Sequence, residues 1–130
     1  MKLLLDTQTF IWLINDDKAL GKTARITLYD TTSELQLSYF SVFEMTIKAS
    51  IGKLDYDSSL IDDLPKMGVE LLMPGLKTLD GYTILNPSNK DPFDNALMVT
   101  ALNEGYVFMT SDTKILNTTV SGLKLVDATK

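Results

Sequence analysis

The chain has 130 residues, 45% of them hydrophobic and 22% charged, which suits one globular domain over residues 1–130 and is unlike a disordered chain. It contains no cysteine, so disulfides, thiolate nucleophiles and zinc–thiolate sites are excluded. It contains no histidine, so Ser-His-Asp and Cys-His hydrolases and histidine general bases are excluded as well. Hydrolysis would therefore depend on carboxylates, with a hard metal ion that prefers oxygen ligands.

Charge and apolar runs limit the partners and the location. The 17 acidic and 12 basic residues give a net charge of −5, which disfavours the approach of nucleic acid unless a bound divalent ion or a basic partner offsets it. Asp6 interrupts the apolar run that precedes it too early for a signal peptide, and no segment is long enough to span a bilayer. We therefore expect a cytoplasmic protein without membrane contact.

Short strands alternate with helices along the whole chain. In chain order, the pattern predicts a strand at 2–5, helices at 7–15 and 18–30, a strand at 34–38, helices at 41–51 and 59–67, a strand at 69–72, helices at 76–82 and 91–104, a strand at 106–110, a helix at 112–116 and a strand at 123–126. A loop is expected over residues 86–89. The helix at 91–104 is apolar nearly all round, which is typical of a buried helix. Strands separated by helices indicate an α/β fold with a mainly parallel sheet covered on both faces.

Four acidic residues fall where predicted strands end or predicted helices begin: Asp6, Glu44, Asp94 and Asp112. In an open parallel sheet these junctions lie at one edge, outside the carboxyl ends of the strands, where such folds build their sites. Carboxylates crowded at that edge repel one another unless they are protonated or neutralised. Mg²⁺ bound by a few carboxylates and several waters would neutralise them, so the pattern predicts a metal site.

Each of these acids also has a purely structural interpretation. Ser41 and Glu44 have the spacing of a capping box, in which the glutamate returns a hydrogen bond to the backbone of the serine. Asp91 can cap the helix whose first turn holds Asp94, and the other two acids can each cap the helix that follows them. Taken singly, the residues favour capping over catalysis.

The segments that carry these acids resemble the PIN-domain nucleases, in particular the VapC-type toxins of bacterial toxin–antitoxin pairs. The resemblance covers nearly the whole chain and rests on four segments in order: Leu3 to Thr7, Ser38 to Leu54, Asp91 to Gly105, and Thr110 to Asp112. No one of these segments is specific alone. Four of them in order, at suitable separations, make a strong signal.

The resemblance implies a single-domain three-layer α/β/α sandwich with a central, mainly parallel sheet, and metal-dependent endoribonuclease activity. It implies that Asp6, Glu44 and Asp94 are the principal ligands of Mg²⁺ or Mn²⁺ and that Asp112 completes the acidic pocket, directly or through water. Hydrolysis of RNA by a metal-bound hydroxide would leave 5′-phosphate and 3′-hydroxyl ends. The resemblance also implies a small antitoxin protein encoded nearby, and a homodimer or an antitoxin complex.

The chain departs from the family at three positions. Gln8, Asn89 and Asn95 stand where many of these toxins have two histidines and an arginine. The missing cations predict weaker substrate binding or slower cleavage. The residues left as candidates to contact phosphate or to orient water are Thr110, Lys48, Lys90 and Asn95, although for the lysines a solvated surface position is the alternative.

Three functions other than a nuclease can be compared with the sequence. A phosphatase of the haloacid-dehalogenase type needs an aspartate where Gln8 stands, and glutamine cannot serve as its acid–base group. A receiver domain needs an acidic pair after the first strand and a phosphate acceptor after the third, and the chain has neither. A catalytically weak or inactive binding module with the PIN fold is compatible with the sequence and stays open.

Overall fold

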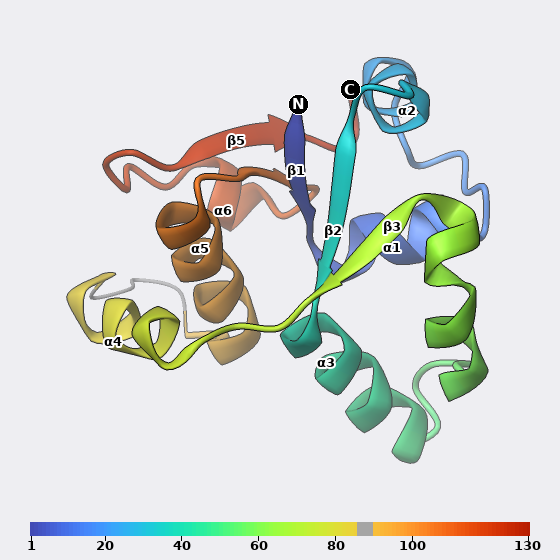
Figure 1. Cartoon of the computed structure of the whole chain (residues 1–130), viewed down its shortest axis with the longest axis horizontal. Coiled ribbons are helices and arrows are strands. Elements are labelled where there is room, and N and C mark those ends of the chain that lie inside the picture. The colour runs from blue at the N-terminus through green and yellow to red at the C-terminus, as the bar shows by residue number, and fades with distance from the viewer. Residues whose placement is uncertain (86–89) are drawn as a thin grey trace.

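The computed structural model describes residues 1–85 and 90–130, which form a five-stranded, all-parallel sheet with the strand order β3-β2-β1-β4-β5 (Figure 1). The strands are β1 (Lys2–Leu5), β2 (Glu34–Ser38), β3 (Val69–Leu72), β4 (Val107–Thr110) and β5 (Lys124–Asp127). The helices are α1 (Thr7–Ile14), α2 (Lys22–Tyr29), α3 (Tyr39–Ser50), the 3₁₀ helix η1 (Ser58–Met67), α4 (Leu76–Leu85), α5 (Pro92–Glu104) and α6 (Thr113–Leu116). All five predicted strands are therefore present, and the loop expected at 86–89 lies outside the described residues.

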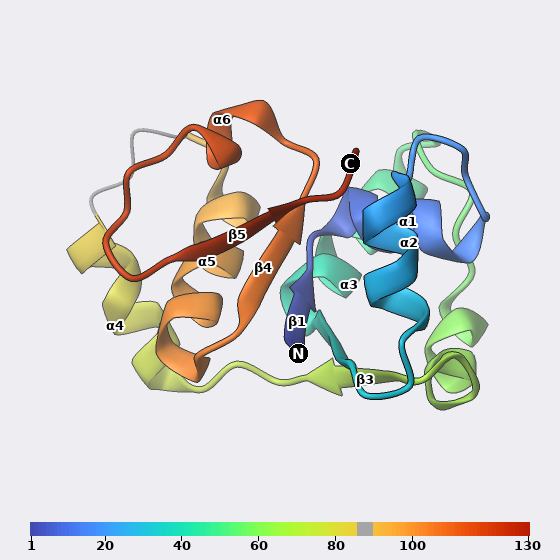
Figure 2. The same ribbon diagram turned by 90° about the horizontal axis from the view of Figure 1, so that it is seen from above.

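Successive side chains of the central strand β1 pack into two different cores. Leu3 and Leu5 belong to the core that α1, α2 and η1 cover. Leu4 belongs to the core on the other face, where it meets Leu97 of α5 and Phe108 of β4. Figure 2 shows the sheet between these two groups of helices. Side chains alternate in direction along a strand, so this packing gives the three-layer α/β/α sandwich that was predicted.

The central layer depends on β1 being buried on both faces. All three of its leucines are fully buried, as expected for a parallel strand covered by helices on each side. α5 is equally enclosed, with seven consecutive buried residues from 95 to 101, and it ends at Gly105, whose φ of 73° lies in the left-handed region. Within the described part of the chain, no helix has the length and apolarity needed to cross a membrane.

Several helix boundaries differ from the sequence-based expectations. α2 begins at Lys22 and not at residue 18, because Asp17 accepts hydrogen bonds that hold the preceding residues in a turn. α4 continues to Leu85, three residues beyond its predicted end. The helix at 58–67 is a 3₁₀ helix that contains Pro65, which lacks the N–H needed for a regular α-helical hydrogen bond.

The beginning of α3 corrects a site prediction. This helix starts at Tyr39, and the Ser38 side chain caps it by accepting a hydrogen bond from the Phe40 N–H. Ser41 therefore lies inside the helix, so the predicted capping box between Ser41 and Glu44 is wrong. Glu44 is left with its carboxylate directed to other partners.

Candidate functional site

The four predicted acids line one cleft of about 300 Å³ at the carboxyl edge of the sheet. Asp6 follows β1, and Asp112 follows β4, which is the neighbouring strand. Glu44 lies on α3, which begins where β2 ends, and Asp94 lies in the first turn of α5 (Figure 1). The chain runs from β1 to β2 on one side and returns to β4 on the other, so the cleft lies at the topological switch point where open α/β sheets bind ligands.

Asp6 is buried and held at both carboxylate oxygens. Oδ1 accepts a hydrogen bond of 2.7 Å from the Thr9 N–H, which makes Asp6 the N-cap of α1. Oδ2 accepts a hydrogen bond from the Thr110 hydroxyl. Burial raises the pKa of Asp6 above its usual 3.8, and the hydrogen bonds from Thr110 and Thr9 oppose that rise. The capping interpretation of Asp6 is confirmed, and it is compatible with ion binding because each carboxylate oxygen has a second lone pair.

Glu44 is held from two sides. Its Oε1 accepts a 2.6 Å hydrogen bond from the Thr7 hydroxyl, and its Oε2 lies 3.1 Å from the Lys48 ammonium. Thr7 is buried, and its hydroxyl oxygen lies 3.1 Å from that of Ser41, which is also buried. Thr7 and Ser41 are site residues that the sequence analysis missed, because their contact depends on how α1 packs against α3. The one local signal is that Thr7 directly follows Asp6.

Asp112 and Asp91 are helix caps that also line the cleft. Asp112 accepts a 2.8 Å hydrogen bond from the Lys114 N–H at the start of α6. Asp91 accepts hydrogen bonds from the Phe93 and Asp94 N–H groups at the start of α5. Both capping interpretations are confirmed. Asp91 is a fifth cleft carboxylate, which the sequence analysis had treated only as a cap.

Two of the residues predicted to contact phosphate or to orient water, Thr110 and Asn95, are buried. Thr110 is fully buried, and its hydroxyl donates a hydrogen bond to the Asp6 carboxylate and accepts one of 3.0 Å from the Asp112 N–H. Asn95, one residue beyond Asp94, is buried and donates a hydrogen bond of 3.2 Å to the Tyr82 hydroxyl of α4. Neither residue is among those that line the cleft, and their predicted contacts with phosphate or water stay predictions.

The remaining predicted residues lie in three different places. Lys48 lines the cleft, as does the exposed Gln8. Lys90 is exposed beside Asp91 and is outside the cleft lining. Asn89 lies outside the described residues, so the structure says nothing of that departure from the family.

The chemistry of the cleft fits a hard divalent ion, although the carboxylates are not gathered around one point. Carboxylate oxygens suit Mg²⁺ and Mn²⁺. Within residues 1–85 and 90–130, no three acidic side chains are grouped tightly enough to hold an ion directly. Hydrogen bonds with backbone N–H groups and a threonine hydroxyl, and the ion pair with Lys48, already hold several of these oxygens. Mg²⁺ commonly uses one or two carboxylates and several waters, so a small adjustment of these side chains would suffice.

The sequence matches no protein-family model, and no curated protein is significantly similar to it. Solved structures, in contrast, resemble it over nearly its full length. A chain of VapBC2 from Rickettsia felis, bound to a DNA fragment from its promoter, has a TM-score of 0.71 and 16% identity, with 98% of each chain covered. A chain of VapBC-1 from nontypeable Haemophilus influenzae has a TM-score of 0.67 and 21% identity, with 100% of each chain covered.

A third similar structure gives the fold its name. A PilT N-terminus domain protein from Sulfolobus solfataricus has a TM-score of 0.59 and 14% identity, with 98% of this chain and 87% of that chain covered. At such low identities the similarity establishes the fold alone. In this chain the acidic cleft lies at the carboxyl edge of the parallel sheet. This chain therefore has the PIN-domain fold, also found in VapBC complexes.

Proposed function

We propose that this chain is a cytoplasmic Mg²⁺- or Mn²⁺-dependent endoribonuclease and the toxin of a toxin–antitoxin pair. The observation that carries the proposal is the single cleft lined by Asp6, Glu44, Asp94 and Asp112 at the switch point of a PIN fold. A bound divalent ion would generate hydroxide from its water and stabilise charge on the scissile phosphate. The four carboxylates would hold the ion, and the hydroxyls of Thr110 and Thr7 fix the directions of the Asp6 and Glu44 carboxylates.

A second candidate function is a PIN-fold binding module with weak or no catalysis. The engagement of Asp6, Asp112 and Asp91 in helix caps favours it, because a cap needs no catalytic reason to exist. The absent histidines and arginine of the related toxins favour it too. Gln8, at the mouth of the cleft, continues to disfavour a phosphatase of the haloacid-dehalogenase type.

Cleavage of RNA distinguishes the two candidates. Purified protein incubated with mixed cellular RNA is expected to release fragments with Mn²⁺ or Mg²⁺ and not with EDTA. Asp6→Asn keeps the cap but loses a ligand charge, so it should cut at least ~100-fold more slowly, since a metal ion contributes several kcal/mol to such reactions. The fragments are read on a sequencing gel, with end labelling to detect 5′-phosphates. Cleavage at the wild-type rate in EDTA would overturn the metal mechanism.

The proposed antitoxin contact is a groove beside the acidic cleft. The groove has a volume of about 340 Å³, and its apolar walls are Ile11, Ile14, Met45, Leu54, Tyr56 and Leu60. Asp55, Asp57 and Asp63 also line it. Ile11 lines both the groove and the cleft, so a bound segment would extend to the carboxylates. An apolar groove with acidic residues fits an amphipathic, basic segment that folds as it binds.

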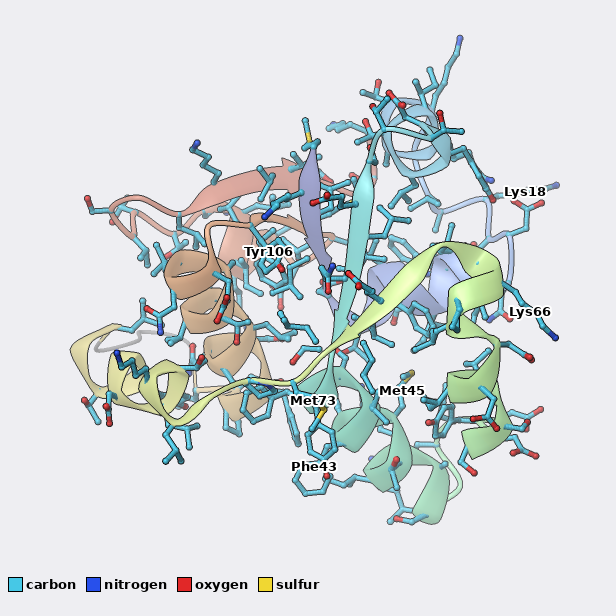
Figure 3. The ribbon with its side chains drawn as sticks, in the orientation of Figure 1. Lys18, Phe43, Met45, Lys66, Met73 and Tyr106 are labelled. Atoms are coloured by element: carbon cyan, nitrogen blue, oxygen red, sulfur yellow. The ribbon has the colours of Figure 1, made fainter. Side chains whose placement is uncertain are left out.

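The proposed homodimer contact is an uncharged apolar surface on α3, in contrast to the acidic groove. Three exposed residues of α3 and its C-cap residue form an uncharged stripe at four-residue spacing: Tyr39, Phe43, Ile47 and Ile51. Figure 3 shows Phe43 and Met45 leaving α3 on different sides, and Met45 is the one that lines the groove. Phe43 also makes an edge-to-face contact with Phe93, at 5.8 Å between ring centroids. An uncharged apolar surface can pair with its own copy, whereas the acidic groove cannot.

Two variants separate these surfaces. The chain is co-expressed with the product of the neighbouring gene, and the mass of the purified complex is measured by sedimentation. Asp55→Lys with Asp63→Lys is expected to lose the small partner and keep the dimer, because charge complementarity is reversed only at the groove. Phe43→Asp is expected to lose the dimer and keep the partner. If no small partner is retained by the wild type and its expression alone leaves growth unchanged, the toxin proposal fails while the fold stands.

A further inference from the structure

Lys48 brings a positive charge into the acidic cleft. It lies one helical turn after Glu44 on α3, and its ammonium is 3.1 Å from the Glu44 Oε2. Both residues line the cleft. A glutamate four residues before a lysine is a common helix-surface pair, usually worth a few tenths of a kcal/mol. The surroundings of this pair are different from those of a surface pair.

Burial distinguishes the Glu44 carboxylate from the other paired acids. In two other ion pairs, Arg25 with Asp16 and Lys66 with Asp63, the acidic side chains are 78% and 54% exposed. The Glu44 side chain is only 12% exposed, whereas that of Lys48 is 46% exposed. Solvent screens a charge at such a buried position less than it screens a surface charge. Lys48 is therefore the main neutralising charge that Glu44 contacts.

The two carboxylate oxygens of Glu44 have different partners, and only the partner of Oε2 could be replaced by an ion. The buried Thr7 hydroxyl holds Oε1 at 2.6 Å and is itself fixed by its contact with Ser41. Oε2 faces the cleft through its pairing with Lys48, a residue with a flexible four-carbon stem. An ion that takes Glu44 as a ligand would therefore approach Oε2, where it would repel the ammonium.

We propose that Lys48 is the built-in counter-cation of the metal-free cleft, which a divalent ion must displace from Glu44 Oε2 in order to bind. This proposal rests on the proposed metal-dependent function. It makes a lysine, and not an acid, the residue that limits the affinity for the ion.

The test compares Lys48→Met with Lys66→Met. Methionine keeps the length and helix preference of the lysine stem while removing its charge. Lys66 pairs with Asp63 at 3.6 Å on η1, and Figure 3 shows it projecting from the surface at that side of the molecule. Each variant loses one lysine, so the two have the same net charge. Mn²⁺ binding is measured by titration calorimetry at fixed ionic strength, and melting curves are recorded in EDTA.

Displacement predicts two opposite effects in Lys48→Met. Its dissociation constant for Mn²⁺ should fall about fivefold or more, a difference of about 1 kcal/mol, whereas Lys66→Met should match the wild type. In EDTA it should melt below Lys66→Met, because Glu44 loses the charge that neutralises it. Equal Mn²⁺ affinities of the two variants, or weaker binding by Lys48→Met, would overturn the displacement and leave the nuclease proposal intact. If neither the wild type nor either variant binds Mn²⁺, the metal-dependent function fails and the displacement fails with it.

Discussion

Mn²⁺ is expected to raise the melting temperature of the wild-type chain and to leave that of Asp6→Asn nearly unchanged. An ion that binds the folded state at about 100 times its dissociation constant adds roughly 2.7 kcal/mol to the free energy of unfolding. Asparagine caps a helix about as well as aspartate, so the variant should stay folded while losing a charged ligand. Melting curves in EDTA, Mg²⁺ and Mn²⁺ at matched ionic strength measure the effect. Three coincident wild-type curves would favour the capping interpretation and remove the main physical support for a nuclease.

The same variant has an expected pH dependence in EDTA. Because burial raises the pKa of Asp6 above 3.8, the folded chain binds a proton at this site more readily than the unfolded chain does. The ionised carboxylate therefore lowers stability at neutral pH, and this cost disappears as the pH falls through the raised pKa to below 3.8. Asp6→Asn should be at least as stable as the wild type at pH ~7, with its advantage shrinking in acid. A variant less stable than the wild type at neutral pH would contradict the burial argument.

Leu97→Ala is expected to lower the free energy of unfolding by about 3 kcal/mol or more. Leu97 is fully buried on α5 and packs with Leu4 of the central strand and Phe108 of its neighbour. Truncation removes a buried side chain and leaves a cavity between α5 and the sheet. Because a domain of this size is stable by only about 5–15 kcal/mol, the loss should be clear in denaturant unfolding.

Leu76→Ala is the matched control. It makes the same chemical change in the first turn of α4, where the leucine is 83% exposed. Surface changes of this kind usually stay within about 0.5 kcal/mol. A comparable loss in both variants would show that the effect of Leu97→Ala comes from helix preference and not from the cavity. Where Leu97→Ala stays folded, it should keep the stabilisation by Mn²⁺, because the cap at Asp91 holds the start of α5 separately.

The sequence by itself determined the layers of this protein. The apolar runs of β1 and β4 are short and are typical of parallel strands that helices cover on both faces. The burial of Leu3, Leu4 and Leu5 in alternating cores follows from the two-residue period of a strand. The cleft could be predicted for the same reason, since parallel strands bring their carboxyl ends, and the acids after them, to one edge.

Only the tertiary structure decided how the cleft residues are directed. The sequence pattern predicted a cap at Ser41, whereas Ser38 caps α3, which begins at Tyr39, and Phe40 packs against the core that includes Leu97 of α5. Because the helix begins there, Glu44 does not cap it, and its carboxylate accepts a hydrogen bond from Thr7, which is 37 residues earlier in the chain. Thr110 likewise meets Asp6 across 104 residues. A short segment of sequence can indicate helix caps and the periodicity of apolar residues. Contacts between residues so far apart depend on how the helices and strands pack, and a short segment does not determine that packing.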